Sequence, residues 1–342
     1  MSAEHEGVRA EHEDVRELLA AWAFGALEPA ERRTVPAHLA TCESCASEAE
    51  RLRATVRLLD GPAVPANGTR RPAADILAGA LRARPAAPRV AAHAAPYAAA
   101  VAGLRALLPE AAGRWATPVV HDWDVHATVA HLLAADEHLA RLLGLAPRVP
   151  PSAIPDGTDW TDAWDRRTAD VIAHEHARSP DRTVAAWSAQ AGEMLAAPEA
   201  HDPERAGRAV LLMGVRLPVA DHYVVRAFET WVHTDDIGRA LGLAVPPPPE
   251  RHVGQLVRLA VRILGLALGP AAPPVLLSVT GCEAWVLGSD AEPVQAELTL
   301  DPYDFCLLVG GRHTPDSVPR GTTGDATAAR HVLDRAAALA WL

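Results

Sequence analysis

The chain has 342 residues, a formal net charge of -11 and 49% hydrophobic residues. Its length allows two or three domains with cores of their own, and its acidic balance excludes a nucleic-acid binder built on a basic patch. The four cysteines lack the spacing of a disulfide framework, and the N-terminus is polar and acidic. We therefore expect a cytoplasmic protein without a signal peptide.

Residues 1–60 predict a small helical domain. Apolar residues recur at helical spacing from Val15 to Trp22, Gly25 follows them, and Pro29 stands at the start of the next helix. A third helix continues after Cys45. Residues 61–92 are rich in proline, alanine and arginine, which predicts a linker with one short helix around Ile76 to Leu81.

Residues 93–248 predict an antiparallel four-helix bundle, because long segments repeat apolar residues with the period of a helix. The predicted bundle helices are Val125–Leu143, Asp159–Ala177, Thr183–Leu195 and Val219–Leu241.

Residues 249–342 predict a small α+β domain, since the apolar period changes after the proline run that ends at Pro249. No membrane span is expected, because the most apolar stretch, Leu256 to Leu268, is short and contains Arg258 and Arg262. The predicted fold class is therefore multidomain and mainly α. The predicted strands are Val275–Val279, Ala284–Leu287 and Ala296–Leu300, and the predicted helices are 250–268, Pro302–Val309 and Ala326–Leu339.

A thiolate-rich cluster of metal-ligand residues lies in the first domain. His38, Cys42 and Cys45 follow a His-x3-Cys-x2-Cys spacing. A closed tetrahedral zinc site needs a fourth ligand, for which His12 is the first candidate and His5 the second. We expect a structural or redox-sensitive zinc site, because a zinc-bound thiolate can be oxidised.

The segment from His12 to Cys45 resembles the zinc-binding anti-sigma domain, over about the first 60 residues. The resemblance implies short helices that clamp an extracytoplasmic-function sigma factor. In some members of that family, oxidation of the paired cysteines expels the zinc and releases the sigma factor. The resemblance implies the fold and the zinc site more directly than it implies a signal.

A second cluster lies in the predicted bundle and contains no cysteine. Glu229 and His233 are four residues apart and so project from one helix face, while His131 lies on another helix. Two imidazoles and one carboxylate leave coordination positions open, as in catalytic metal sites. On spacing alone, a histidine such as His131 is usually a core residue, and a pair such as Glu229–His233 is often a surface ion pair.

Two segments resemble the mycothiol-dependent maleylpyruvate isomerase family: Trp123 to Ala135, and Phe228 to Gly242 with its Glu-x3-His-Thr-x-Asp-Ile pattern. The resemblance covers roughly residues 93–342. It implies a DinB-like four-helix bundle, a sterol-carrier-like C-terminal domain, and a metal triad that maps onto His131, Glu229 and His233. It also implies mycothiol as cofactor.

The same resemblance assigns an active-site arginine after a glycine, which here is Arg312 in Leu308-Val309-Gly310-Gly311-Arg312. A guanidinium suits a carboxylate substrate because it offers two parallel donors. The alternative is an arginine that caps a surface turn. A ligand imidazole commonly needs a carboxylate partner, for which Asp235 and Asp236 are candidates, and Asp236 matches the family position.

The leading hypothesis is a mycothiol-dependent metalloenzyme, an isomerase or S-transferase, that acts on an electrophilic and partly anionic small molecule. It would hold zinc at two sites, although the metal of the open site is not fixed by its ligands. The second hypothesis is an anti-sigma regulator whose bundle serves as a sensor or scaffold. A metal-binding bundle without a thiol cofactor is the third.

Overall fold

The structure is a computed structural model that describes residues 3–59, 89–212 and 214–339. The chain forms two compact units, Met1–Pro85 and Ala86–Leu342, and each is described by itself. The predicted linker helix around Ile76 to Leu81 lies outside the described residues. The domain boundaries expected at 60/61, 92/93 and 248/249 stay predictions.

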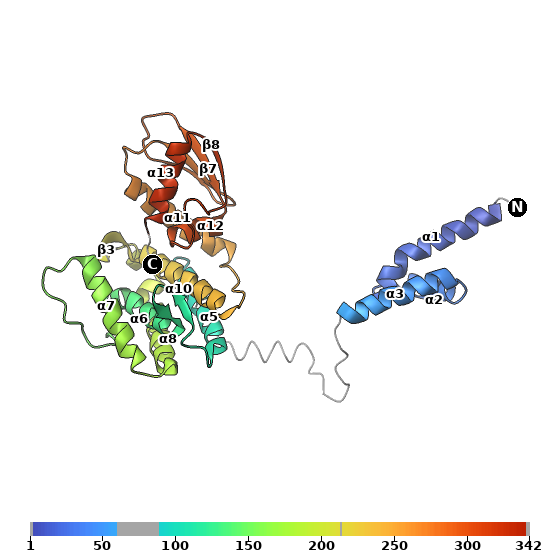
Figure 1. The fold of residues 1–342 in the computed structure, drawn as a ribbon, viewed down its shortest axis with the longest axis horizontal. Coiled ribbons are helices and arrows are strands. Elements are labelled where there is room, and N and C mark those ends of the chain that lie inside the picture. Colours follow the sequence, from blue (N-terminus) through green and yellow to red (C-terminus); the bar gives the residue numbers. More distant parts are fainter. Residues whose placement is uncertain (1–2, 60–88, 213, 340–342) are drawn as a thin grey trace. The chain divides into compact units, whose positions relative to one another are not determined.

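The N-terminal unit contains three helices, α1 (Ala3–Ala23), α2 (Glu31–Leu39) and α3 (Glu43–Leu59) (Figure 1). Helix α1 packs against α3, and Gly25 turns the chain after α1 with a left-handed φ of 71°. Such a small core favours a stabilising metal. The buried apolar side chains of this unit are Val15, Leu19, Leu27, Val35, Cys45 and Ala49.

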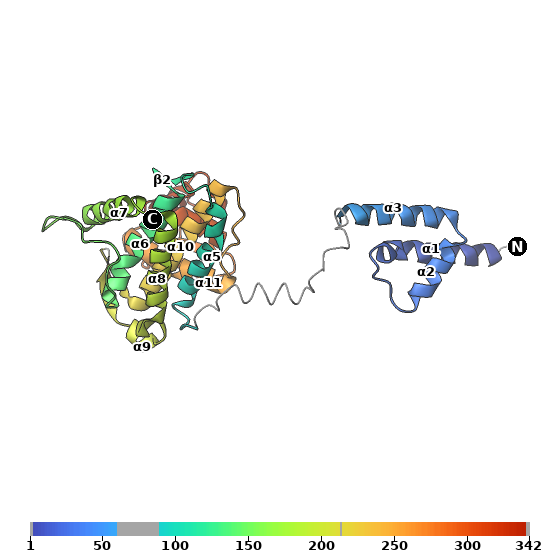
Figure 2. The ribbon, with the colours of Figure 1, turned by 90° about the horizontal axis from the view of Figure 1, so that it is seen from below.

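The second unit begins with a helical bundle in which α10 packs along both α5 and α6, and α8 packs against α6 (Figure 2). These four helices enclose the largest buried side chains of the unit, among them Trp187, Tyr97 and Tyr223. The bundle helices are α5 (Ala95–Leu107), α6 (Val125–Leu142), α8 (Pro180–Ala196) and α10 (Val219–Leu241).

The fourth bundle helix differs from the prediction. Helix α7 (Trp160–His176) was expected in the bundle, but it lies outside α6 and buries only Arg167, Thr168, Val171 and Glu175. Its place is taken by α5, which buries Tyr97 among small residues. The sequence of α5 is largely alanine, so it lacks the contrast between polar and apolar faces that marks a helix in a sequence.

Local features set the start and the end of the two helices that matter most here. Asp124 caps α6, because its side chain accepts a hydrogen bond of 2.7 Å from the backbone amide of Ala127. Gly242 ends α10 in a left-handed conformation with φ 69°. The shorter elements of this part are η1 (Leu108–Ala111), β1 (Pro118–Val120), β2 (Trp123–Asp124), η2 (Pro198–Ala200), α9 (Pro203–Ala206), β3 (Ala209–Leu212) and β4 (Val215–Pro218).

The C-terminal part is a four-stranded sheet with strand order β6-β5-β7-β8 and helices packed beside it (Figure 1). Strands β5 and β7 are parallel, and the other two pairs are antiparallel. Helix α11 contacts α10 of the bundle as well as α12 and α13. The elements are α11 (Glu250–Leu268), β5 (Val275–Val279), β6 (Ala284–Leu287), β7 (Ala296–Leu300), α12 (Pro302–Val309), β8 (Arg320–Gly324) and α13 (Ala326–Ala337).

The predicted fold class, mainly α with an α+β C-terminal domain, is confirmed. Strand β8 was not predicted, because all five of its residues are exposed and none alternates with a buried one. In the part of the chain that the structure describes, no helix combines the length and the apolar character needed to cross a membrane.

Candidate metal centres

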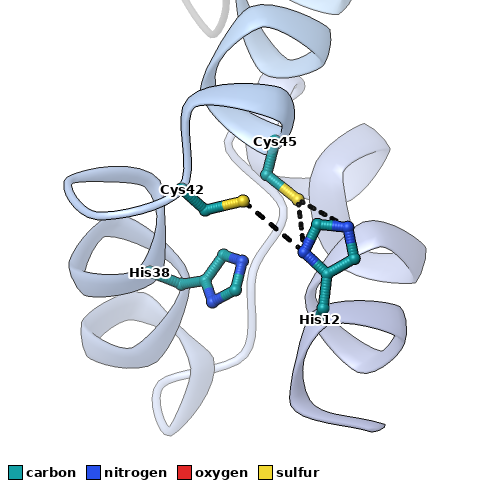
Figure 3. Close-up of side chains that lie close together, drawn as sticks. All are labelled: His12, His38, Cys42 and Cys45. Atoms are coloured by element: carbon teal, nitrogen blue, oxygen red, sulfur yellow. Dashed lines mark hydrogen bonds between the residues drawn. The ribbon is translucent and has the colours of Figure 1, made fainter. Parts of the chain in front are cut away.

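The structure brings His12, His38, Cys42 and Cys45 together in the N-terminal unit (Figure 3). His12 lies on α1, and His38 lies in the last turn of α2. Cys42 is the residue before α3, and Cys45 lies in the first turn of α3. Their ligand atoms all lie within 4.8 Å of one another. Cys42 Sγ lies 3.5 Å and Cys45 Sγ 3.6 Å from His12 Nδ1. The side chain of His5, the second candidate, lies outside the described part.

The chemistry of this cluster fits zinc. Two thiolates and two imidazoles are a common ligand set of closed tetrahedral zinc sites. His38 Nε2 is buried without a hydrogen-bond partner among the described residues, as expected of a ligand atom. The Ser44 hydroxyl, 3.2 Å from Cys42 Sγ, is the main cause that lowers the pKa of Cys42 to about 6, whereas burial raises the pKa of Cys45.

The structure also brings His131, Glu229 and His233 together, inside the bundle. His131 projects from α6, and the other two project from one face of α10, one turn apart. His131 Nε2 lies 2.8 Å from Glu229 Oε1, and the two imidazole rings are 5.0 Å apart between centroids. All three side chains are buried, with at most 2% of each residue exposed. We call this group the triad.

The triad has the properties of neutral metal ligands. Burial is the largest cause that lowers the pKa of His131 and of His233, each to about 3, so both imidazoles are neutral near pH 7. Metal binding needs a neutral imidazole. His233 Nε2 is buried and finds no hydrogen-bond partner among the described residues. A nitrogen and oxygen ligand set without thiolate matches catalytic rather than closed structural sites.

The other nitrogen of His233 faces a carboxylate. Asp236 Oδ2 lies 3.2 Å from His233 Nδ1, so a proton on Nδ1 leaves Nε2 free as a ligand. Burial acts to raise the pKa of Asp236, but its contacts with His233 and Arg312 outweigh that effect and lower it. Asp235 instead pairs with Arg239 at 2.5 Å.

Arg312 reaches the triad from the C-terminal part of the unit. Its Nη2 lies 2.5 Å from Asp236 Oδ2, its Nε donates to both oxygens at 3.2 Å, and its Nη1 donates to the Gly310 carbonyl. Its Nη2 also lies 3.5 Å from His233 Nδ1. The side chain is 9% exposed, so the alternative of a surface cap does not describe it.

Aromatic rings cover the triad, and the sequence had given no role to them. Trp123 stacks on His131 with 4.4 Å between ring centroids, and Trp164 meets the same imidazole edge-on at 5.8 Å. Both indoles are only partly buried. His121, which has a left-handed φ of 53°, packs its ring against Trp123. Trp123 stands at the start of the segment that resembles the family, which was a signal in the sequence.

Arg226 is a further residue beside the triad that its sequence pattern does not single out. It lies one turn before Glu229 on α10, and its Nη2 pairs with Glu229 Oε2. Its other neighbour is Asp136 of α6, with 4.0 Å between Arg226 Nε and Asp136 Oδ1. The three-residue spacing from Arg226 to Glu229 is visible in the sequence, but the partner on α6 is not.

Comparisons with known proteins match these two clusters. The family model described as mycothiol maleylpyruvate isomerase N-terminal domain matches residues 94–238, and the model described as putative zinc-finger matches residues 13–46. An uncharacterized protein of Mycobacterium tuberculosis, found in two strains, is 27% identical over 234 residues. The match covers 63% of this chain and 82% of that protein.

Among solved structures, the chain is similar to the crystal structure of the mycothiol-dependent maleylpyruvate isomerase. The TM-score is 0.48 at 14% identity, over 68% of this chain and 93% of that one. The triad lies within the first family match, and three of the four thiolate-site residues lie within the second. Residues 94–238 therefore fit the mycothiol maleylpyruvate isomerase N-terminal domain family, and residues 13–46 fit the putative zinc-finger family.

Proposed function

We propose that this protein is a metal-dependent enzyme that uses mycothiol or a similar small thiol. It would isomerise an electrophilic, anionic small molecule or transfer the thiol to it. The observation that carries the proposal is the buried triad inside a domain of the mycothiol maleylpyruvate isomerase family. The family model that matches residues 94–238 is described by that activity, and the activity comes to this chain as a proposal.

In this proposal His131, Glu229 and His233 hold a divalent metal, with zinc as the first candidate. A metal at the triad would lower the pKa of a thiol and so supply a nucleophile at neutral pH. Asp236 fixes the His233 imidazole by its contact with Nδ1. Trp123 and Trp164 limit the access of water to the triad from the side of His131.

Arg312 is proposed as the group that binds the anionic part of the substrate. Its guanidinium lies beside His233, but Nε and Nη2 already contact Asp236. The substrate carboxylate would therefore meet the remaining N–H groups while Asp236 holds the planar fork in place. In this proposal the anion would lie within reach of the triad.

Thiol conjugation tests the proposal directly. The purified protein is incubated with mycothiol and a panel of electrophiles, and product formation is followed by mass spectrometry. His131→Ala is expected to abolish turnover and to remove one metal equivalent. His174→Ala, which changes a partly exposed histidine on α7, is the matched control. It should leave the turnover and the metal content unchanged. A wild-type protein inactive with mycothiol and other small thiols across the panel contradicts the proposal.

A second candidate function concerns the N-terminal unit. We propose that it holds zinc through His12, His38, Cys42 and Cys45, and that an extracytoplasmic-function sigma factor is its partner. The zinc-finger match is the observation that favours this candidate. Tight sigma-factor binding by a protein without thiol activity would make it a regulator whose bundle is a sensor or scaffold.

A further inference from the structure

A row of buried charged side chains lies next to the triad, and the proposed reaction assigns no role to Arg226 and Asp136 in it. Glu229 of α10 pairs with Arg226, and Arg226 lies beside Asp136 of α6. Arg226 is 3% exposed and Asp136 1% exposed. Burying charged groups is costly, and even a paired buried charge commonly adds little to stability. Stability alone therefore does not explain why these charges lie behind the triad.

Asp136 is fixed by hydrogen bonds from two other helices. Its Oδ2 accepts from the Tyr97 hydroxyl at 2.6 Å and from Trp187 Nε1 at 3.2 Å. Tyr97 belongs to α5 and Trp187 to α8, so all four bundle helices contribute to one network. The other oxygen of Asp136, Oδ1, faces Arg226.

Arg226 is not placed to bind a substrate. The cavity that it lines, together with His138 and His222, has a volume of only about 20 Å³. Such a space holds about one water molecule, and a small carboxylic acid is larger. The contacts of Arg226 therefore run to the protein's own carboxylates.

The two oxygens of Glu229 have different neighbours. Oε1 faces His131 Nε2 at 2.8 Å, on the side of the triad, while Oε2 faces Arg226. We propose that Arg226, backed by Asp136, is a positioning residue that holds Oε2 of Glu229 so that Oε1 alone is presented as a ligand to a divalent cation. This inference rests on the proposed metal site.

The consequence is a preorganised ligand. A carboxylate free to rotate exposes either oxygen and loses conformational freedom when it binds a metal, whereas Glu229 is already held. Groups that orient metal ligands in this way commonly change metal affinity by roughly 10- to 100-fold when they are altered. Arg226→Lys keeps the charge but loses the planar guanidinium, which pairs with Glu229 and lies 4.0 Å from Asp136.

The test is the affinity of the full-length protein for Co(II) and Zn(II) in competition with a chelator. Co(II) bound by thiolates shows sulfur-to-metal charge-transfer absorption, which the triad lacks, so the two sites are read separately. Arg226→Lys and Asp136→Asn are each expected to weaken the triad site by roughly 10- to 100-fold. The thiolate site should keep its wild-type affinity.

The matched control is Arg167→Lys. Arg167 is also buried and pairs with Glu137, the neighbour of Asp136 on α6, at 2.5 Å, but it has no contact with the triad. This variant should lose thermal stability while its triad affinity stays unchanged. Asp136→Asn keeps the side-chain shape and can still accept from Tyr97 and Trp187, so it carries the test if Arg226→Lys does not fold.

The outcomes separate the two ideas. If wild-type protein binds no metal that His131→Ala removes, the proposed metal site fails. If wild-type protein binds that metal and both Arg226→Lys and Asp136→Asn bind it equally well, only the positioning role of Arg226 is overturned.

Discussion

The Arg312 guanidinium holds the Asp236 carboxylate against the imidazole of His233. Arg312 Nη2 and Asp236 Oδ2 are 2.5 Å apart, and the same oxygen lies 3.2 Å from His233 Nδ1. Arg312 follows α12 of the C-terminal part, while Asp236 and His233 lie on α10 of the bundle. The C-terminal part therefore supplies a group that orients a candidate ligand, so the triad environment is complete only when both parts are packed together.

Asp236→Asn is expected to weaken metal binding at the triad by roughly 10-fold or more, because an amide no longer stabilises a proton on His233 Nδ1. Metal affinity measured by chelator competition checks this. Asp235→Asn is the control, since Asp235 is the next residue and pairs with Arg239 at the surface. Equal loss in both variants would mean that the Asp236 contact has no specific role at the triad.

Arg312→Ala is expected to reduce stability by roughly 3 kcal/mol, because it leaves the buried Asp236 carboxylate without its cation. If Arg312 also binds the substrate, KM for an anionic substrate should rise. Arg312→Lys should not restore KM fully, since one ammonium cannot hold Asp236 as the guanidinium does and also present further N–H groups to the substrate. Urea unfolding and steady-state kinetics measure the two effects. A stability loss with unchanged KM would leave Arg312 as an anchor for Asp236 only.

The pairs within each cluster could be identified from the sequence because their spacing is local, whereas His131 was assigned to the triad through the family resemblance. Glu229 and His233 lie one helical turn apart, and Cys42 and Cys45 are separated by two residues, so short-range geometry places each pair. The structure places His131 and His12 beside these pairs, as expected. Whether the clusters hold metal stays a prediction.

The remaining parts of the site depend on tertiary packing. Nothing local relates Arg226 to Asp136, because their contact follows from the register between α6 and α10. Trp164 covers His131 because α7 lies outside α6 instead of in the bundle, which helical periodicity does not decide. Helix α5 was missed since its run of alanines gives no amphipathic pattern.

In metal-free protein, Cys42 should be the most reactive thiol near pH 7. Its pKa is lowered to about 6, mainly by the hydrogen bond with Ser44, whereas burial raises the pKa of Cys45 and of Cys282. Cys42 is then largely thiolate, which is the nucleophilic form. Alkylation with iodoacetamide, read residue by residue by mass spectrometry, should label Cys42 first.

Ser44→Ala serves as the matched variant, because it removes the main cause of the low pKa and leaves the ligands in place. It should raise the pKa of Cys42 and slow its alkylation near pH 7, and zinc should protect both cysteines in either protein. Preferential labelling of Cys45, or an unchanged rate in Ser44→Ala, would contradict the assigned role of the hydroxyl.

Metal-free protein is expected to lose stability as the pH falls below about 6.5. His131 and His233 have folded-state pKa values of about 3, far below the ordinary value of 6.5. Between these values the unfolded chain takes up protons that the folded chain does not, so the free energy of unfolding decreases on acidification. Burial lowers further imidazole pKa values in the same direction, those of His126, His138, His222 and His252.

Asp136 acts in the opposite sense, because burial raises its pKa from 3.8 to about 6, so the folded state gains a proton before the unfolded chain does. Burial also raises the pKa of Asp235, and Cys42 with its pKa of about 6 gains a proton in the folded state over the same range. Three groups therefore oppose six imidazoles, and the net effect should be destabilisation by acid. Urea unfolding of chelator-treated protein, followed by circular dichroism from about pH 7 to about pH 5, measures it. His131→Gln, which removes one of the buried imidazoles, should show a shallower dependence. Stability that stays constant or rises over this range would mean that the buried imidazoles are not held neutral.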